Sequence, residues 1–241
     1  MIDKYFKDFD KKIIAKSKTA AKDSSKKGDA KSGAGKTIDL KMLKEALSGI
    51  IPVGLIVESV KPIDSTGFSP ECVDLVAYKE YCPDIIKLMD GYVPCELIYG
   101  LYHIIQNFNK DSLVDILNKV ITAKKLNRYS ANPDEMQQNH IPSFVIAAST
   151  NYQFNDLKND IVNYYLSKNI EYQFEIDILV ILQKGIVVKN WREKRSFIAL
   201  ETKEDTTMWF YILMNEYLDV NKDITVDFRK YIAKDVVYNE Y

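Results

Sequence analysis

Apolar residues recur along the chain in two spacings that predict alternating strands and helices. Continuous apolar runs bounded by Gly and Pro are typical of buried strands, whereas apolar positions three and four residues apart are typical of helices. The runs predict strands within 53–60, 72–79, 93–106, 143–150 and 174–182. The helical spacing predicts helices at 2–14, 39–48, 111–126, 154–168, 205–219 and 223–234.

The order and character of these elements indicate the fold class. Strands alternate with helices, and the strand runs are too continuously apolar for a sheet with one face in water. Helices must therefore cover both faces. We predict an α/β fold, a three-layer sandwich with a mixed central sheet flanked by helices.

Residues 15–37 interrupt this pattern. They are rich in Lys, Ser, Gly and Ala and contain no apolar side chain larger than alanine, so they cannot bury enough surface to offset the entropy of ordering. We predict a flexible linker here, between an N-terminal amphipathic helix at 1–14 and a folded domain at 38–241. This helix is expected to dock on the domain or on a partner. Its apolar side consists of Ile2, Tyr5, Phe6, Phe9 and Ile13.

Composition excludes several classes of protein. The 241 residues are 46% hydrophobic and 28% charged, which excludes a fully disordered, collagen-like or membrane-spanning chain. The N-terminus is charged throughout and lacks the apolar core of a secretory signal, so we expect a cytoplasmic protein. Cys72, Cys82 and Cys95 are odd in number and form no CxxC pair. This argues against a disulfide framework or a zinc ribbon and predicts reduced core thiols.

Charge is divided unevenly along the chain. Residues 1–44 hold thirteen lysines and six aspartates, a net charge of +7, and because the whole chain carries −1, residues 45–241 carry −8. Phosphate contacts supply most non-specific affinity for nucleic acid, and an acidic body does not favour them. The body therefore favours a protein partner, whereas the lysine-rich segment favours a loose, salt-sensitive attachment to nucleic acid.

The body has one basic cluster, within the run NWREKRS at 190–196. An aromatic ring beside several cations suits contact with a phosphate chain. A solvated hairpin is the alternative explanation of the same run. The candidate nucleic-acid-binding residues are Trp191, Arg192, Lys194 and Arg195.

A glycine-rich segment and two histidines were considered as chemical motifs. The sequence SGAGKT, which ends in Gly35-Lys36-Thr37, resembles part of a phosphate-binding loop, but Ala30 stands where that loop needs glycine and no strand precedes it. We predict no nucleotide at this linker. Neither His103 nor His140 lies in a recognisable nucleophile motif.

Four segments in order resemble a known family. They are IPVGLIVESV, CVDLVAYKEYCP, VPCELIYGLYHII and NKDSLVDILNKVITAKKL, and the likeness extends more weakly to SFVIAAST and EIDILVILQKGIVV. Together they resemble domain of unknown function 6602, a bacterial and phage family of the restriction-endonuclease-like PD-(D/E)xK nuclease superfamily. The resemblance implies the restriction-endonuclease-like form of the sandwich and a mobile-element or anti-phage setting.

The resemblance also implies the position of an active site. Asp74 matches the metal-binding aspartate of the family, and Glu96 matches a glutamate that begins the next strand. His103 then occupies the place of the second acid, and Ile105 the place of the lysine. Histidine adds no negative charge for a hard cation, and isoleucine cannot move a proton. The resemblance thus implies a degenerate site, with no cofactor, and Mg²⁺ or Mn²⁺ only if the protein is active.

Catalysis with rearranged ligands is the first alternative. The lysine could be replaced from elsewhere, by Lys79, Lys87 or Lys110. Asp74, Glu96 and His103 could instead form a softer site for manganese or zinc. Because Glu96 and His103 are seven residues apart, an uninterrupted strand would point them to opposite faces, unless a bulge near Gly100 changes the phase.

Three functions remain open from the sequence. The first is a catalytically degenerate nuclease-fold protein that acts as a binding or accessory module for a protein or nucleic acid. The second is an active metal-dependent nuclease. The third is a purely structural protein whose tethered N-terminal helix docks into another subunit.

Overall fold

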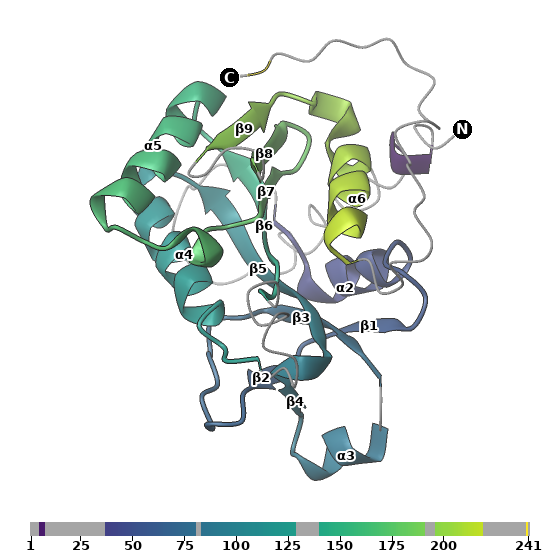
Figure 1. Cartoon of the computed structure of the whole chain (residues 1–241). Coiled ribbons are helices and arrows are strands. Elements are labelled where there is room, and N and C mark those ends of the chain that lie inside the picture. Colours follow the sequence, from purple (N-terminus) through teal and green to yellow (C-terminus); the bar gives the residue numbers. More distant parts are fainter. Residues whose placement is uncertain are drawn as a thin grey trace, which may run out of the picture.

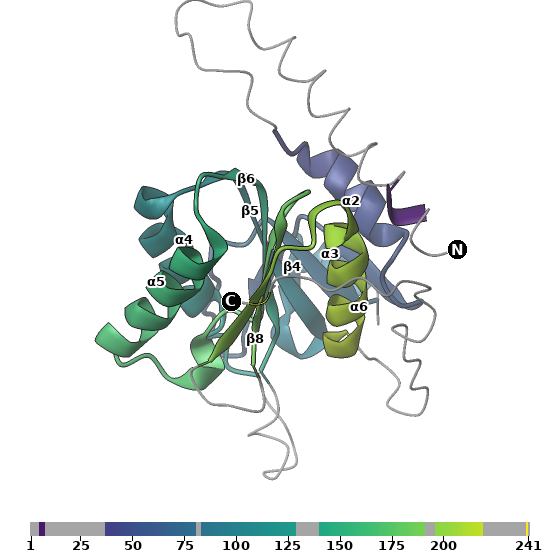
Figure 2. The ribbon, with the colours of Figure 1, turned by 90° about the horizontal axis from the view of Figure 1, so that it is seen from above.

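A mixed sheet of seven strands lies between two layers of helices (Figure 1). This arrangement comes from a computed structural model of the chain, in which residues 5–7, 37–80, 83–128, 140–190, 196–218 and 240 are described. The view from above separates α4 and α5 on one face of the sheet from α2 and α6 on the other (Figure 2). The predicted three-layer α/β sandwich is confirmed.

The large sheet has the strand order β1-β3-β5-β6-β7-β8-β9. Its strands are β1 (Leu55–Glu58), β3 (Leu75–Lys79), β5 (Ile98–Phe108), β6 (Ser143–Thr150), β7 (Ile178–Ile181), β8 (Gly185–Lys189) and β9 (Phe197–Leu200). A separate parallel pair consists of β2 (Lys61–Ile63) and β4 (Tyr92–Pro94). The helices are α2 (Leu40–Ser48), α3 (Pro83–Leu88), α4 (Lys110–Ala123), α5 (Phe154–Ser167) and α6 (Thr206–Tyr217), with short 3-10 helices η2 (Cys95–Leu97), η4 (Tyr172–Phe174) and η5 (Lys203–Asp205).

The direction of the strands follows from their connections. The pairs β5–β6 and β6–β7 are parallel, and each is joined through a helix, α4 or α5. Parallel neighbours need such a crossover, because a tight turn can only reverse the chain. The outer pairs β1–β3, β3–β5, β7–β8 and β8–β9 are antiparallel. The mixed character of the sheet is therefore set by two helical crossovers at its centre.

Each face of the sheet has its own apolar core. Leu43, Leu47 and Met208 belong to the core beneath α2 and α6, and Leu117 and Leu157 to the one beneath α4 and α5. All four residues of β7 are buried, as expected of a strand covered on both faces. None of the described helices is long and apolar enough to cross a bilayer.

The predicted strand over 93–106 is wrong in its first part. The structure divides it into β4, the 3-10 helix η2 and β5, so that Glu96 lies in a turn and not on a strand. Pro94, which cannot donate to a ladder, stands at the break. A bulge near Gly100, left open by the sequence, is present, since Ala77 pairs with Gly100 but Tyr78 pairs with Ile98.

Gly100 leaves room for side chains that pack over β5. A Cβ atom at this position would come within 2.9 Å of the Phe144 ring. The structure also contains β2, α3, β8 and β9, which the sequence pattern did not predict as elements. The helix predicted at 223–234 lies outside the described residues, as does the linker up to residue 36.

Candidate functional site

Asp74 lies where β3 begins, against the middle of β5. Its backbone N–H donates to the Tyr102 carbonyl at 3.0 Å, and its carboxylate Oδ2 accepts the N–H of Ile104 at 2.7 Å. Because Leu75 is paired with Tyr102, the antiparallel register places Asp74 opposite His103. The structure thus brings together two of the three residues that the sequence singles out for metal binding.

His103 is fully buried in β5 and faces the loop before Asp74. Its Nδ1 lies 2.8 Å from the carbonyl oxygen of Cys72. A carbonyl only accepts, so Nδ1 carries the proton and Nε2 presents a lone pair. Nε2 has no hydrogen-bond partner among the described residues. Burial lowers the pKa of His103 to about 4, so the ring is neutral at pH 7.

Glu96 is held apart from this pair, in η2. Arg128 donates to the Glu96 carbonyl oxygen at 2.8 Å. The pKa of Cys95 is raised to about 12, first by burial and second by the negative charge of the Glu96 carboxylate. Cys95 is buried and Cys72 half-buried, and both are free thiols. Cys82 lies outside the described residues.

The side chains present do not fit a divalent cation of the nuclease type. Within the part of the chain that the structure describes, no three His, Cys, Asp or Glu residues are placed to share a metal ion. Hard cations such as Mg²⁺ need several oxygen ligands. Here one oxygen of Asp74 already serves a backbone N–H, and His103 opposite offers a buried nitrogen.

The strand beside Asp74 contains no charged residue. The eleven residues of β5, IYGLYHIIQNF, include no Asp, Glu, Lys or Arg. A glutamate-x-lysine pair is therefore absent from β5 in any register, not only at the positions of His103 and Ile105. On the other face of the strand, Gln106 accepts the N–H of Ile38 and donates to its carbonyl, which fixes the segment before α2.

Lys119 of α4 interacts electrostatically with Asp74. Burial raises the pKa of Asp74 above its usual value, and both the Ile104 N–H and the positive charge of Lys119 oppose this shift. The same ammonium contributes to lowering the pKa of His103. Lys119 also forms an ion pair with Asp115 one turn earlier, at 2.9 Å.

The lysines proposed from the sequence lie elsewhere. Lys79 is exposed at the end of β3, Lys87 lies in α3 beside Asp84 at 3.5 Å, and Lys110 is the exposed first residue of α4. Sequence analysis missed Lys119. Its spacing from Asp115 predicts a surface ion pair, but only the packing of α4 on the sheet brings it towards Asp74.

A second cluster of buried charges lies where β6 and β7 begin. Lys124 Nζ is 2.5 Å from Asp177 Oδ2 and 2.8 Å from the Glu175 carbonyl oxygen. Asp177 Oδ2 also accepts the Ser143 N–H at 2.8 Å. Both side chains of the ion pair are 2% exposed. Each charge is thus met by an opposite charge and by backbone groups.

Lys189 at the end of β8 completes this cluster. It is buried, and its ammonium donates to the Tyr172 carbonyl oxygen and lies 3.7 Å from the centre of the Tyr172 ring. Burial, followed by repulsion from Lys124, lowers the pKa of Lys189 to about 8. No sequence pattern indicates this cluster, because Lys124, Asp177 and Lys189 are far apart in the chain.

The two remaining groups of candidate residues lie largely outside the described part of the chain. Trp191, Arg192, Lys194 and Arg195 fall in the undescribed segment 191–195. This segment joins the antiparallel strands β8 and β9, and the Asn190 N–H donates to the Ser196 carbonyl at 2.9 Å across its base. Gly35 and Lys36 are likewise outside, and Thr37 begins the described body.

Sequence comparisons give no relative for the chain. No family model matches it, so membership of domain of unknown function 6602 stays a prediction. No curated protein matches it either.

Structural comparison does find similar proteins. NucC of P. aeruginosa ATCC27853 in its cAAA-bound form is 11% identical, over 90% of each chain, with a TM-score of 0.63. NucC of E. coli MS115-1 is similar in its apo form, with 17% identity over 80% of this chain and 88% of that one and a TM-score of 0.59. Its cAAA-bound form is 14% identical over 90% of each chain, with a TM-score of 0.60. These neighbours have the restriction-endonuclease-like fold, and the chain shares that fold.

Proposed function

We propose that this chain is a nuclease-fold protein that binds without cutting, as an accessory module in an anti-phage or mobile-element setting. The observation that carries the proposal is the composition of β5, which has no acid and no lysine beside Asp74. The contacts of Asp74 and His103 support it, because both side chains are bound to backbone groups.

The missing groups are the ones that the reaction needs. In a metal-dependent nuclease, carboxylates retain the cation that lowers the pKa of the attacking water, and a neighbouring group moves its proton. Proton transfer alone contributes about 10²–10⁴-fold in rate. His103 has its one free nitrogen enclosed, and Ile105 can neither hold a proton nor stabilise a phosphate. Efficient hydrolysis of a phosphodiester is therefore not expected.

The structural neighbours support the proposed setting. The neighbours are NucC structures, two of the three in a cAAA-bound form, and the anti-phage setting is the one that the family resemblance implies. An accessory role in a comparable system would use the shared scaffold for recognition. The net charge of −8 on residues 45–241 favours a protein as the partner.

Cleavage is tested directly with the full-length chain. Supercoiled plasmid and single-stranded DNA are incubated with the protein in Mg²⁺ or Mn²⁺, beside the Asp74→Ala variant. We expect no cleavage above that of the variant in either metal. Metal-dependent cleavage that disappears in Asp74→Ala would overturn the proposal and favour an active nuclease with rearranged ligands.

Binding is tested separately. A gel-shift titration with DNA and RNA at two salt concentrations identifies phosphate-driven attachment, which weakens steeply with salt. A thermal shift with cAAA tests the ligand seen in the neighbours. If neither DNA nor RNA is retarded in the gel at low salt, and cAAA does not raise the melting temperature of the protein, nucleic acid is excluded as the partner. A protein is then the expected partner.

A further inference from the structure

The N-terminal segment at residues 5–7 is helical and lies against α6 (Figures 1 and 2). Phe6 is 3% exposed, and the centre of its ring is 5.0 Å from that of Tyr211. Lys7 Nζ lies 2.8 Å from Glu204 Oε1 in η5. One buried aromatic anchor and one ion pair thus attach this segment to a body that resumes at residue 37.

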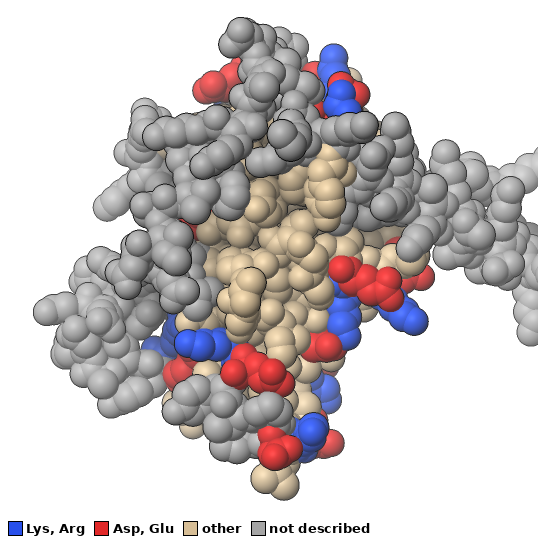
Figure 3. All heavy atoms as spheres, turned by 90° about the vertical axis from the view of Figure 1, so that its right-hand side faces the viewer, with Lys and Arg blue, Asp and Glu red and all other residues tan. Residues whose placement is uncertain are grey.

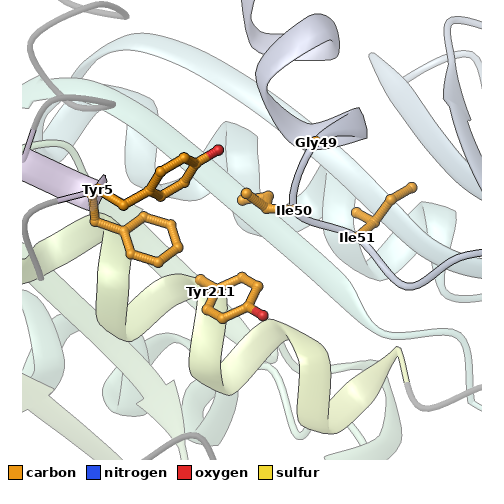
Figure 4. Close-up of a pocket in the computed structure, with 6 residues that line it drawn as sticks. Tyr5, Gly49, Ile50, Ile51 and Tyr211 are labelled. Carbon is orange, nitrogen blue, oxygen red and sulfur yellow. The ribbon is translucent and has the colours of Figure 1, made fainter. Parts of the chain in front are cut away.

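A pocket of about 290 Å³ lies beside this anchor, between the N-terminal segment, the turn after α2 and α6. Figure 4 shows Tyr5 on one side of it, Ile50 and Ile51 on another, and Tyr211 of α6 below. None of the described residues that line this pocket is charged, and Tyr5 is 55% exposed. Tyr5 and Phe6 form one wall of the pocket, and the body supplies the other walls. We call these body residues, Gly49, Ile50, Ile51 and Tyr211, the α6 groove.

α6 is apolar around most of its circumference. Met208, Phe210, Ile212 and Met214 are buried in the core that α6 shares with the sheet, and most of the residues between them are also large and apolar. Trp209, Tyr211, Leu213 and Tyr217 are only partly buried. A helix that is apolar on all sides is normally covered on all sides. Figure 3 shows this side of the molecule, where the described residues at the centre carry no charge and Lys, Arg, Asp and Glu lie around its edges.

We propose that the α6 groove is a binding site for an amphipathic helix, and that the N-terminal arm of the same chain is its tethered and separable ligand. The arm presents two adjacent aromatic residues followed by a base, Tyr5, Phe6 and Lys7. Phe6 and Tyr5 meet the apolar walls, and Lys7 meets the acid at the rim. The uncharged centre of this face suits an apolar helix side and not a charged partner.

Because the arm and the body belong to one chain, a weak contact is sufficient to keep the arm in the α6 groove. With the flexible linker that the sequence predicts at 15–37, the arm would be held at an effective concentration of about 1 mM. An arm whose intrinsic dissociation constant is below this value occupies the groove most of the time and still leaves it readily. The α6 groove is thus an interaction surface that its own arm covers, independently of whether the protein cuts DNA.

The test separates the arm from the body after folding. A site for a specific protease is inserted into the linker at 15–37 of the full-length chain, the folded protein is cut, and retention of the arm is followed by gel filtration over a dilution series. We expect the arm to co-elute with the body at high concentration and to separate on dilution. Phe6→Ala should weaken retention by about 10- to 100-fold, from the loss of one buried aromatic side chain. Tyr5→Ala, which removes the more exposed neighbour, should weaken it less.

Charge reversal tests the orientation of the arm. Lys7→Glu or Glu204→Lys alone should weaken retention by about two- to five-fold at low salt, and the two together should restore it. An arm that separates at every concentration, or that Phe6→Ala leaves equally bound, overturns the proposal. So does an uncut protein that is oligomeric and becomes monomeric with Phe6→Ala, because the arm would then sit on a second copy.

Discussion

Two buried polar clusters lie near α4, Lys124–Asp177 and Asp74–His103, and they differ in how their polar groups are compensated. At Lys124–Asp177, each charge meets an opposite charge within 2.5 Å and backbone groups besides. At Asp74–His103, the histidine is neutral, one of its ring nitrogens has no partner among the described residues, and the hydrogen bond that the structure gives the carboxylate comes from the backbone.

The difference indicates what each cluster does. A buried ion pair that is also hydrogen-bonded to backbone groups is a structural element, and removing one half leaves an uncompensated charge. At Asp74–His103 one ring nitrogen has no partner among the described residues, and under the proposed function this is a nuclease site whose ligands have been replaced. The first cluster should therefore dominate stability, and the second should respond to pH but not to metal.

The largest effect is expected at Asp177. Asp177→Ala leaves the buried ammonium of Lys124 without its carboxylate and the Ser143 N–H without an acceptor, which should lower the free energy of unfolding by about 3–5 kcal/mol. Urea denaturation measures this value. The double variant Lys124→Met with Asp177→Leu is the control and should recover much of the loss. A single variant as stable as the double would contradict a structural ion pair.

The next effect is expected at His103 in acid. Its folded pKa is about 4 and its ordinary value 6.5, so the unfolded chain binds the proton first as the pH falls. Stability is complete above pH 6.5 and is lost progressively towards pH 4, by about 3 kcal/mol for this group. Urea titrations at pH 7 and pH 4.5 should show a larger loss in the parent than in His103→Leu.

The half-buried His140 provides a matched control for this experiment. His140→Gln should leave most of the acid sensitivity in place. If His103→Leu and the parent lose the same free energy between the two pH values, the buried neutral ring is not the cause.

Much of the fold could be predicted from the sequence, and the reason is the length of the apolar runs. The runs that contain β6 and β7 are continuous and covered on both faces, and the spacing in α4 and α5 is regular. The strands β2 and β9 have three and four residues, too few for a period to appear. Before β5, the apolar pattern runs without interruption from β4 through Pro94 and the turn η2, so pattern alone cannot locate the break.

The candidate site was predictable only in part. The pairing of Asp74 with His103 follows from neighbouring strands whose order the resemblance supplied. The approach of Lys119 could not be predicted, because it depends on how α4 packs over β5. Lys124 and Asp177 are 53 residues apart, and nothing local marks either residue as buried.

A smaller effect, with the same dependence on pH as that of His103, is expected at Lys189 in alkali. Its folded pKa is about 8 and its ordinary value 10.5, so between these values the unfolded chain binds more protons than the folded one. Folding is then favoured as the pH rises, by about 2 kcal/mol between pH 7 and pH 9.5. Urea denaturation of the parent and of Lys189→Met should show this gain only in the parent. A gain of equal size in the variant would assign it to other groups.

The smallest effect is expected at Asp74, and it tests the central comparison. Asn can accept the Ile104 N–H as the carboxylate does, whereas Ala cannot, so Asp74→Ala should lose about 1 kcal/mol and Asp74→Asn almost nothing at pH 7. Burial raises the pKa of Asp74, so its carboxyl favours folding at low pH and this contribution is lost as the pH rises through the folded pKa. The neutral amide therefore carries no penalty at pH 7. A cation held at this position would reverse the result, since Mg²⁺ or Mn²⁺ would then raise the melting temperature of the parent and not that of Asp74→Asn. Equal melting temperatures with and without metal would leave Asp74 as a backbone acceptor in a scaffold that no longer binds the ion.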